Sequence, residues 1–507
     1  MSTSLRVIKN TGFLYFRLII TLVVSLWTTR IILEALGVDN FGVYNVVGGV
    51  VALLGFLNAS LSTSSQRFLS YAEGKGDKKQ QLIVFNCCIV LHISIGIIVG
   101  LLFILAGFIF FNGILNIPSN RIFAAEIVYA STAVSALASI LSVPYEATIN
   151  AHENMRYYAF IGILEVLLKL AIAFLVIFIK SDRLIIYGIL MGFIHVITFL
   201  IIRTYCHKKY SECKIDFKKY INKPTIKELG SFAGWNLLSS SSSMITQYGM
   251  NIIVNHFFGV IVNAAQGIAA QVSGVLSNLS TNALKALNPI IVKSESQHDR
   301  NRMLYISLMG CKISFFIFGF LSMPLMLNMA LILDLWLTEV PQWTIIFCQY
   351  GLVRILLEQL TFGLTTSIMA HGNIRRFNIW RSISNITPLI VTPILFKYNF
   401  EPFWMYVVWI VSWSCLGGLV IILFSHKLVG MSIRQYLREN LLPCLLTWCL
   451  PYVSSVYILR TVNYMDYRYN LLVTIIGILF YLALSWYFIL NREERKILLN
   501  ILLRKFK

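Results

Sequence analysis

Charged side chains recur inside long apolar stretches of this chain, where charge is rare. Glu165 and Lys169 are four residues apart, and so are Arg354 and Glu358. That spacing puts both partners of each pair on one face of a helix. Each pair can therefore be a structural ion pair, a polar cavity site or a coupling switch. Arg17 and Lys312 have no acid at helical spacing, so we expect these two bases to meet an anionic ligand.

A second pattern is a stripe of polar residues in the apolar stretch 229–256. Its members follow each other at steps of three or four, which places them on one helical face; they are Asn236, Ser240, Ser243, Gln247, Asn251 and Asn255. Two interpretations stay open for the serines, because small polar residues also allow close helix packing in membranes. For the amides at successive turns we expect a hydrated cavity.

The elements that must position these residues are membrane-spanning helices. The chain has 507 residues, 57% of them hydrophobic and 13% charged, with a mean hydropathy of +0.74. So much apolar surface requires lipid as a solvent. The net charge of +20 comes from clusters between apolar stretches, which is typical of loops at a membrane surface and excludes nucleic acid as the partner.

We predict an all-α integral membrane protein of about 14 transmembrane helices. The expected spans are 9–35, 41–64, 83–112, 122–148, 157–179, 184–202, 229–256, 260–283, 303–331, 343–370, 378–396, 403–425, 441–459 and 470–490. They form an N-terminal half (1–204), a basic cytoplasmic linker (205–228), a C-terminal half (229–425), a terminal helix pair (441–490) and a basic cytoplasmic tail (491–507). The two halves have six helices each.

Orientation follows from Lys and Arg, which accumulate on the cytoplasmic side. With both termini cytoplasmic, 31 of these bases fall on the inner side and six on the outer side. The chain is therefore expected to be a multi-pass protein of the cytoplasmic (inner) membrane, with the lipid bilayer as a partner.

A short internal repeat supports two halves of the same orientation. Phe41-Gly42-Val43 recurs as Phe258-Gly259-Val260, Leu61-Ser62-Thr63 recurs as Leu279-Ser280-Thr281, and Arg67 is matched by Lys285. Parallel repeats of this kind are typical of transporters.

No catalytic or metal-binding group is apparent. The longest outer loop, 333–342, offers only Asp334 and Glu339, and the histidines are scattered singly among apolar neighbours. Most of the nine cysteines lie in apolar stretches, where they act as small hydrophobic residues. We therefore expect neither an enzyme nor a metal or cofactor.

Several segments resemble a known family. They are Leu36-Gly37-Val38-Asp39-Asn40-Phe41-Gly42-Val43-Tyr44, Ser65-Gln66-Arg67-Phe68-Leu69-Ser70, Gly74-Lys75-Gly76-Asp77, Val143-Pro144-Tyr145, and Ala151-His152-Glu153-Asn154-Met155 with the helix of Glu165 and Lys169. Over about the first 170 residues the chain resembles O-antigen-type oligosaccharide flippases of the multidrug/oligosaccharidyl-lipid/polysaccharide exporter superfamily.

The resemblance implies two six-helix halves around a cavity that opens alternately to each side. It implies a polyprenyl-diphosphate-linked oligosaccharide as substrate, with polysaccharide polymerase and chain-length machinery as further partners. The cationic cavity residues that it suggests are Arg17, Arg30, Arg67, Lys285, Lys312 and Arg354. Arg30 lies nearer the outer end of its span, from where it can also reach the interface.

Two other functions remain open. One is a cation-coupled multidrug exporter of the same superfamily; the other is a membrane glycosyltransferase or polymerase. An exporter of cationic drugs suits a negatively charged cavity, whereas bases outnumber acids in mid-span here. The acids expected to test proton coupling are Glu126, Glu165 and Glu358.

Overall fold

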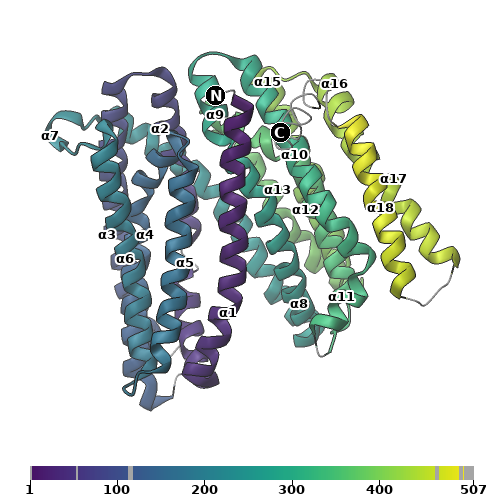
Figure 1. Ribbon diagram of the computed structural model, residues 1–507, viewed down its shortest axis with the longest axis horizontal. Helices are drawn as coiled ribbons and strands as arrows, with labels where there is room; N and C mark the ends of the chain where they lie inside the picture. The colour runs from purple at the N-terminus through teal and green to yellow at the C-terminus, as the bar shows by residue number, and fades with distance from the viewer. Residues whose placement is uncertain are drawn as a thin grey trace, which may run out of the picture. The chain divides into compact units, whose positions relative to one another are not determined.

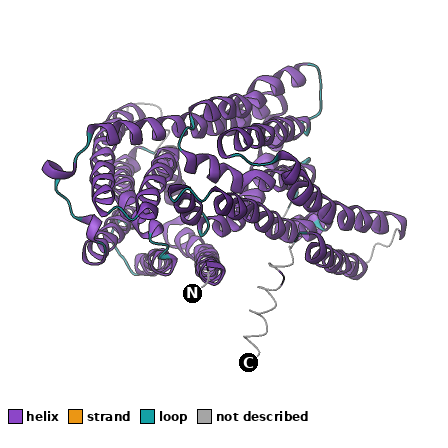
Figure 2. Cartoon of the chain, turned by 90° about the horizontal axis from the view of Figure 1, so that it is seen from above, coloured by secondary structure: helices purple, strands orange, loops and turns teal. Residues whose placement is uncertain are grey.

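The computed structural model describes residues 3–52, 55–111, 118–337, 339–462, 467–489 and 495. These residues are almost entirely helical, and no strand occurs among them (Figure 2). Eleven helices in this part of the chain are long and apolar enough to cross a membrane. The prediction of an all-α multi-pass membrane protein is confirmed. The basic tail 491–507 lies outside the described residues except for Arg495.

The chain divides into two compact units, 8–237 and 238–507 with 1–7. Six long helices and short connecting elements build the N-terminal unit (Figure 1): α1 (Thr3–Ala52), α2 (Gly55–Lys75), α3 (Lys78–Ile109), η2 (Ser119–Arg121), α4 (Ile122–Ala151), α5 (Met155–Ile177), α6 (Arg183–Lys209), η3 (Ser211–Cys213) and α7 (Phe217–Tyr220). Side-chain caps start several of them: Asp77 Oδ1 accepts from the backbone N–H groups of Lys79 and Gln80, both at 3.0 Å.

The long helix α8 (Lys223–Lys285) leads into the C-terminal unit. The other elements of this unit are α9 (Asn288–Ser296), α10 (Arg300–Leu327), α11 (Met329–Trp336), α12 (Thr344–His371), α13 (Arg375–Lys397), α14 (Trp404–Trp409), the π-helix η4 (Ile410–Leu416), α15 (Gly417–Val429), α16 (Ile433–Tyr436), the π-helix η5 (Leu437–Leu441), α17 (Leu442–Val462) and α18 (Tyr467–Phe488). The predicted terminal pair is α17 and α18, and it packs against α10, where Trp448 Nε1 donates to the Gly319 carbonyl at 3.3 Å.

Three of the fourteen predicted spans, 41–64, 229–256 and 260–283, are not among the eleven apolar helices. They lie in the end of α1, in α2 and in the two arms of α8. Their described residues are helical but rich in Ser, Thr, Asn and Gln, which lowers their hydropathy. The same polar residues led to the prediction that one face of these helices points away from lipid.

Both α1 and α8 bend at one glycine. Gly37 has φ 76° and ψ 165°, and Gly259 has φ 78° and ψ −171°. Side-chain-bearing residues avoid this backbone region, whereas glycine enters it readily. The predicted outer loop 36–40 is therefore a kink within a helix. The predicted repeat register is wrong: the partner of Gly259 is Gly37 and not Gly42.

A shift of 222 residues also relates other features of the two units. Gly76 and His298 have φ of 69° and 60°, and Asp77 and Asp299 cap the helices that follow, α3 and α10. The fold therefore contains two repeats. Under this shift Arg67 no longer matches Lys285.

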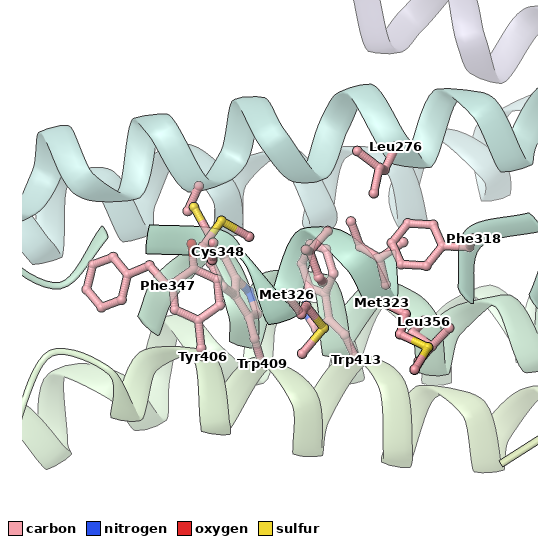
Figure 3. Close-up of a cluster of buried hydrophobic side chains, with 14 of the residues drawn as sticks. Leu276, Phe318, Met323, Met326, Phe347, Cys348, Leu356, Tyr406, Trp409 and Trp413 are labelled. Atoms are coloured by element: carbon pink, nitrogen blue, oxygen red, sulfur yellow. The ribbon is translucent and has the colours of Figure 1, made fainter. Parts of the chain in front are cut away.

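Each unit has its own apolar core and a lipid-type surface. In the C-terminal unit Met326, Phe347, Tyr406 and Trp409 are buried together (Figure 3). On α3 of the other unit, four apolar residues at steps of four, three and four are 60–73% exposed; they are Ile97, Leu101, Ile104 and Phe108. Such a face is unfavourable in water and suits lipid.

Candidate functional site

The N-terminal unit encloses a small polar basin, a cavity of about 130 Å³. Its polar lining comes from four helices: Arg17 (α1), Ser139, Ser142 and Glu146 (α4), Tyr158 and Glu165 (α5), and His195 and Thr198 (α6). A cavity needs only about 10–15 Å³ on this measure to hold one water molecule. The basin therefore has room for several waters.

Glu165, which lines the basin, contacts two nitrogen-bearing side chains. Its Oε1 lies 2.6 Å from Lys169 Nζ and 3.7 Å from His195 Nε2. His195 Nδ1 in turn lies 2.8 Å from Ser135 Oγ. The predicted Glu165–Lys169 pair is present, and the structure adds an imidazole to it.

A second acid, Glu146, shares the basin. Its Oε1 accepts a hydrogen bond from Ser142 Oγ at 2.6 Å. Arg17 lies on the opposite helix, with its guanidinium carbon 4.8 Å from the Tyr158 ring centre. Two bases, Arg17 and Lys169, thus accompany two acids, and the ionised basin is close to neutral overall. An acid, an imidazole and water in reach of each other can accept and pass a proton.

Gly162 makes the position of Arg17 possible. A Cβ atom on Gly162 would overlap the Arg17 guanidinium. The side chain of Arg17 therefore passes directly over the α5 backbone at this point, on its way to the basin. A residue without a side chain is the one type that leaves room for it.

In the C-terminal unit a different cluster forms around Arg354. Its Nη1 lies 2.7 Å from Glu358 Oε1, as predicted from the spacing. Its guanidinium carbon is 5.2 Å from the Trp413 ring and 5.7 Å from the Trp409 ring, distances suited to cation–π contact. Arg354 Nε and Trp409 Nε1 are buried and have no hydrogen-bond acceptor among the described residues.

A second guanidinium joins this cluster from α13. Arg381 Nη1 donates to the Trp413 carbonyl at 3.1 Å and lies in electrostatic range of Glu358 and Arg354. The π-helix η4 supplies this carbonyl, and π-turns inside helices are frequent at functional sites. A Cβ atom on Gly417 would overlap Arg381 Nη1, so a glycine again makes room for an arginine.

The cluster has an excess of positive charge. Two guanidinium groups, of Arg354 and Arg381, accompany one carboxylate, of Glu358. Lys312 is 6% exposed on α10, and it forms no hydrogen bond or ion pair with the residues that the structure describes. A base in mid-membrane costs roughly 2.5–3.5 kcal/mol when nothing compensates it. An anionic group would lower that cost.

The other predicted cationic residues lie elsewhere within their own units. Arg30 is exposed on α1, thirteen residues beyond Arg17, which is about 20 Å along a helix. Arg67 is buried near the end of α2, with Phe68, Tyr71 and Phe232 rings 4.4–5.4 Å from its guanidinium carbon. Lys285 is exposed at the end of α8. Among the six, Arg17 alone lines the basin.

The polar stripe on α8 has two parts. Ser243 Oγ accepts from Asn385 Nδ2 of α13 at 2.8 Å, and Thr246 Oγ1 donates to the Asn385 carbonyl at 2.8 Å. This part is helix–helix packing, as one of the two interpretations proposed. Gln247 is exposed and Asn251 half-buried, and neither forms a described hydrogen bond, while Asn236 is buried. Ser240 is half-buried.

The remaining predicted acid, Glu126, is exposed on the first turns of α4 and does not line the basin. Four further residues of the two sites were not predicted from the sequence: Glu146, Arg381, Trp409 and Trp413. His195, one of the singly scattered histidines, is a further member of the basin that was not predicted. A signal existed for Glu146, which lies four residues after Ser142 on one helical face. Nothing in the sequence marks the π-helix that brings Trp413 to Arg381.

No family model and no curated protein match this sequence. Solved structures do match. A MATE mutant structure has a TM-score of 0.72 at 14% identity and covers 83% of this chain and 96% of its own. An outward-facing multidrug resistance MATE family transporter of the MOP superfamily has 0.69 at 14%, with coverages of 83% and 96%.

A third match is a MOP superfamily transporter from Pyrococcus furiosus, with a TM-score of 0.71 at 11% identity and coverages of 84% and 97%. Its published description says that reverse polarity of its binding pocket suggests a different function. All three are described as transporters or MATE proteins, and none as an enzyme. The chain therefore has the fold of the MATE transporters of the MOP superfamily.

Proposed function

We propose that this chain is a flippase that moves a polyprenyl-diphosphate-linked oligosaccharide from the cytoplasmic to the outer leaflet of the inner membrane. One observation carries the substrate class: on helices of the C-terminal unit that can span a membrane, the guanidinium groups of Arg354 and Arg381 accompany one carboxylate, of Glu358, and the same unit buries Lys312. A diphosphate is the kind of group that guanidinium and ammonium donors bind best in a site of low water content.

The solved structures favour the alternative, a cation-coupled multidrug exporter, over the flippase. One of the three matching structures is described as a multidrug resistance MATE family transporter, and none of the three is described as a flippase. The nearly neutral basin, with Glu146, Glu165 and His195 in one cavity, also fits coupling to a cation. On fold alone, the drug exporter is the better-supported candidate.

We infer the class of substrate from the charge of the site and not from the fold. Proteins of one fold carry many functions, and the site decides among them. The description of the Pyrococcus furiosus transporter links pocket polarity to function within this same fold. A lipophilic cation next to Lys312 or Arg354 would be repelled, because like charges in a medium of low dielectric constant interact strongly.

The test is the sidedness of the lipid-linked oligosaccharide in cells that contain or lack the protein. The flippase proposal expects the intermediate to accumulate on the cytoplasmic face in its absence. Arg354→Ala and Lys312→Ala at normal abundance should have the same effect, whereas Arg30→Ala, on an exposed residue, should transport normally. If the intermediate crosses without the protein, and its loss sensitises cells to lipophilic cations, the drug exporter is right.

A further inference from the structure

Two histidines occupy equivalent positions in the two repeats. His152 follows the last residue of α4, and His371 is the last residue of α12. In each case the next residue adopts a left-handed backbone, Glu153 with φ 56° and Gly372 with φ 95°. The flanking sequences Ala151-His152-Glu153-Asn154 and Ala370-His371-Gly372-Asn373 share three of four residues.

Each imidazole meets a carboxylate from an equivalent turn. His152 Nδ1 lies 3.3 Å from Glu73 Oε1, and His371 Nδ1 lies 3.7 Å from Glu295 Oε1. Glu73 and Glu295 are 222 residues apart, the shift that relates the two kinked glycines. Their carbonyls accept from the backbone N–H of Gly76 and His298, both at 3.0 Å. The contact is therefore a repeated feature of the fold.

The N-terminal copy has a second partner that the other copy does not have. His152 Nε2 is in very short contact with Glu212 Oε1, and Glu212 is 6% exposed. The imidazole also stacks on Tyr210, with ring centres 4.3 Å apart and planes 8° apart. Within the described residues, His371 Nε2 meets no second carboxylate. The charge and the ring of His152 thus hold two residues of the segment between α6 and α8.

That segment, 210–222, is the link that joins the six helices of the N-terminal unit to α8. Further along it, Asn86 Nδ2 of α3 donates to the Lys214 carbonyl at 2.9 Å, and Asn86 Oδ1 accepts from Asp216 N–H at 3.0 Å. The link therefore packs against the N-terminal unit over several of its residues. The lysines in and just before the link are exposed: Lys208 and Lys209 at the end of α6, and Lys214, Lys218 and Lys219 in the link itself.

We propose that His152 is a charged clasp that docks the first residues of the link, 210–213, onto the N-terminal unit, and that His371 is the repeat-related contact without this role. Because both ring nitrogens face carboxylates, the clasp needs the doubly protonated ring. The clasp adds a conformational device to the fold: opening it releases residues 210–213 from the N-terminal unit, while Asn86 still holds Lys214 and Asp216. This inference does not depend on the transported substrate.

Limited trypsin digestion of the purified, full-length protein tests the clasp. Proteolysis of a site that opens transiently follows the population of the open form. We expect His152→Gln and Glu212→Gln to raise the initial cleavage rate after Lys208, Lys209 and Lys214 by about tenfold or more, which corresponds to about 1.4 kcal/mol. His371→Gln is the matched control, and it should leave cleavage of the link at the wild-type rate.

Two results would overturn the clasp. One is unchanged cleavage of the link in both His152→Gln and Glu212→Gln. The other is an equal increase with His371→Gln, which would show a general loosening. If His152→Gln fails to give a monodisperse protein, Glu212→Gln decides alone, because it keeps the His152–Glu73 contact.

Discussion

The two repeats place charge in the membrane in different ways. In the N-terminal unit, Glu165 is paired with Lys169 and lines a basin that has room for water and contains a second acid and an imidazole. In the C-terminal unit, Arg354 and Glu358 form the same type of helical pair, but among Trp409, Trp413 and a second arginine. One spacing thus gives a nearly neutral, hydrated site in one repeat and a positive, aromatic site in the other.

This difference suggests a division of labour within one fold. Where water and nearly equal numbers of acids and bases are present, side chains can be protonated and deprotonated with a small change in free energy. A positive, poorly hydrated cluster binds an anion strongly, because the interaction is little screened. The four predictions below test that contrast, from the largest expected effect to the smallest.

Removing the acid of the helical ion pair should lower the free energy of unfolding more in the C-terminal unit, at Glu358, than in the N-terminal unit, at Glu165. Glu358→Gln leaves two guanidinium groups, of Arg354 and Arg381, without a carboxylate among aromatic rings; the pair is half-buried, so the loss should approach the cost of about 3–5 kcal/mol for breaking a buried pair. Glu165→Gln leaves Lys169, whose side chain is partly exposed, without its carboxylate beside a cavity with room for water, so we expect a loss of about 1 kcal/mol. Reversible unfolding of both variants in detergent measures this, and equal losses would remove the contrast.

The His152 clasp should give the protein a stability term that depends on pH. Burial opposes protonation of His152, but hydrogen bonds and charges from Glu212 and Glu73 outweigh it and raise its pKa to about 9. Because the folded pKa exceeds the unfolded value of about 6.5, the contribution is complete below pH 6.5 and disappears as the pH rises through 9. It amounts to at most about 3 kcal/mol.

The check is the difference in unfolding free energy between wild type and His152→Gln at pH 6, 7.5 and 9.5. Tyr210, Glu73 and Glu212 face the ring and stay the same in both proteins. We expect the difference to shrink toward pH 9.5. A constant difference over this range would mean that His152 is held by packing and not by its charge.

The two glycines that make room for arginines should respond differently to the same added methyl group. Gly417→Ala forces Arg381 away from a packed π-helix, and overpacking costs about 1–3 kcal/mol. Gly162→Ala pushes Arg17 toward a cavity with room for water, so its stability loss should be below 1 kcal/mol, while transport falls by about tenfold. Unfolding and transport assays on both variants measure this. A larger stability loss for Gly162→Ala contradicts the hydrated basin.

The smallest effect concerns the polar stripe on α8. Ser243→Ala removes an acceptor of Asn385, and interhelical hydrogen bonds in membranes average about 0.6 kcal/mol. We expect a small loss of stability and normal transport. Asn251→Ala, eight residues further along the same face, should keep stability and reduce transport. If Ser243→Ala alone impairs transport, the serines belong to the substrate path.

Much of the fold could be predicted from the sequence because span length and hydropathy have direct physical causes in lipid. The pairs at spacing four were also predictable, since 3.6 residues per turn place them together. The sequence could not show that Arg381 reaches Trp413, because that contact depends on a π-helix with no simple sequence signal. The predicted alignment of the two repeats was wrong at Gly42 because short apolar motifs match by chance. The equivalence of Gly37 and Gly259 rests on their backbone conformation, which the sequence motif does not show.

The most direct test of the account is binding of two ligands of opposite charge to the purified protein. The ligands are a short-chain polyprenyl diphosphate sugar and tetraphenylphosphonium. We expect the diphosphate to bind, Arg354→Ala to weaken it by about tenfold, equivalent to about 1.4 kcal/mol, and Glu165→Gln to leave it unchanged. Preferential binding of the cation, with the diphosphate insensitive to Arg354→Ala, would contradict the anionic substrate and support the drug exporter.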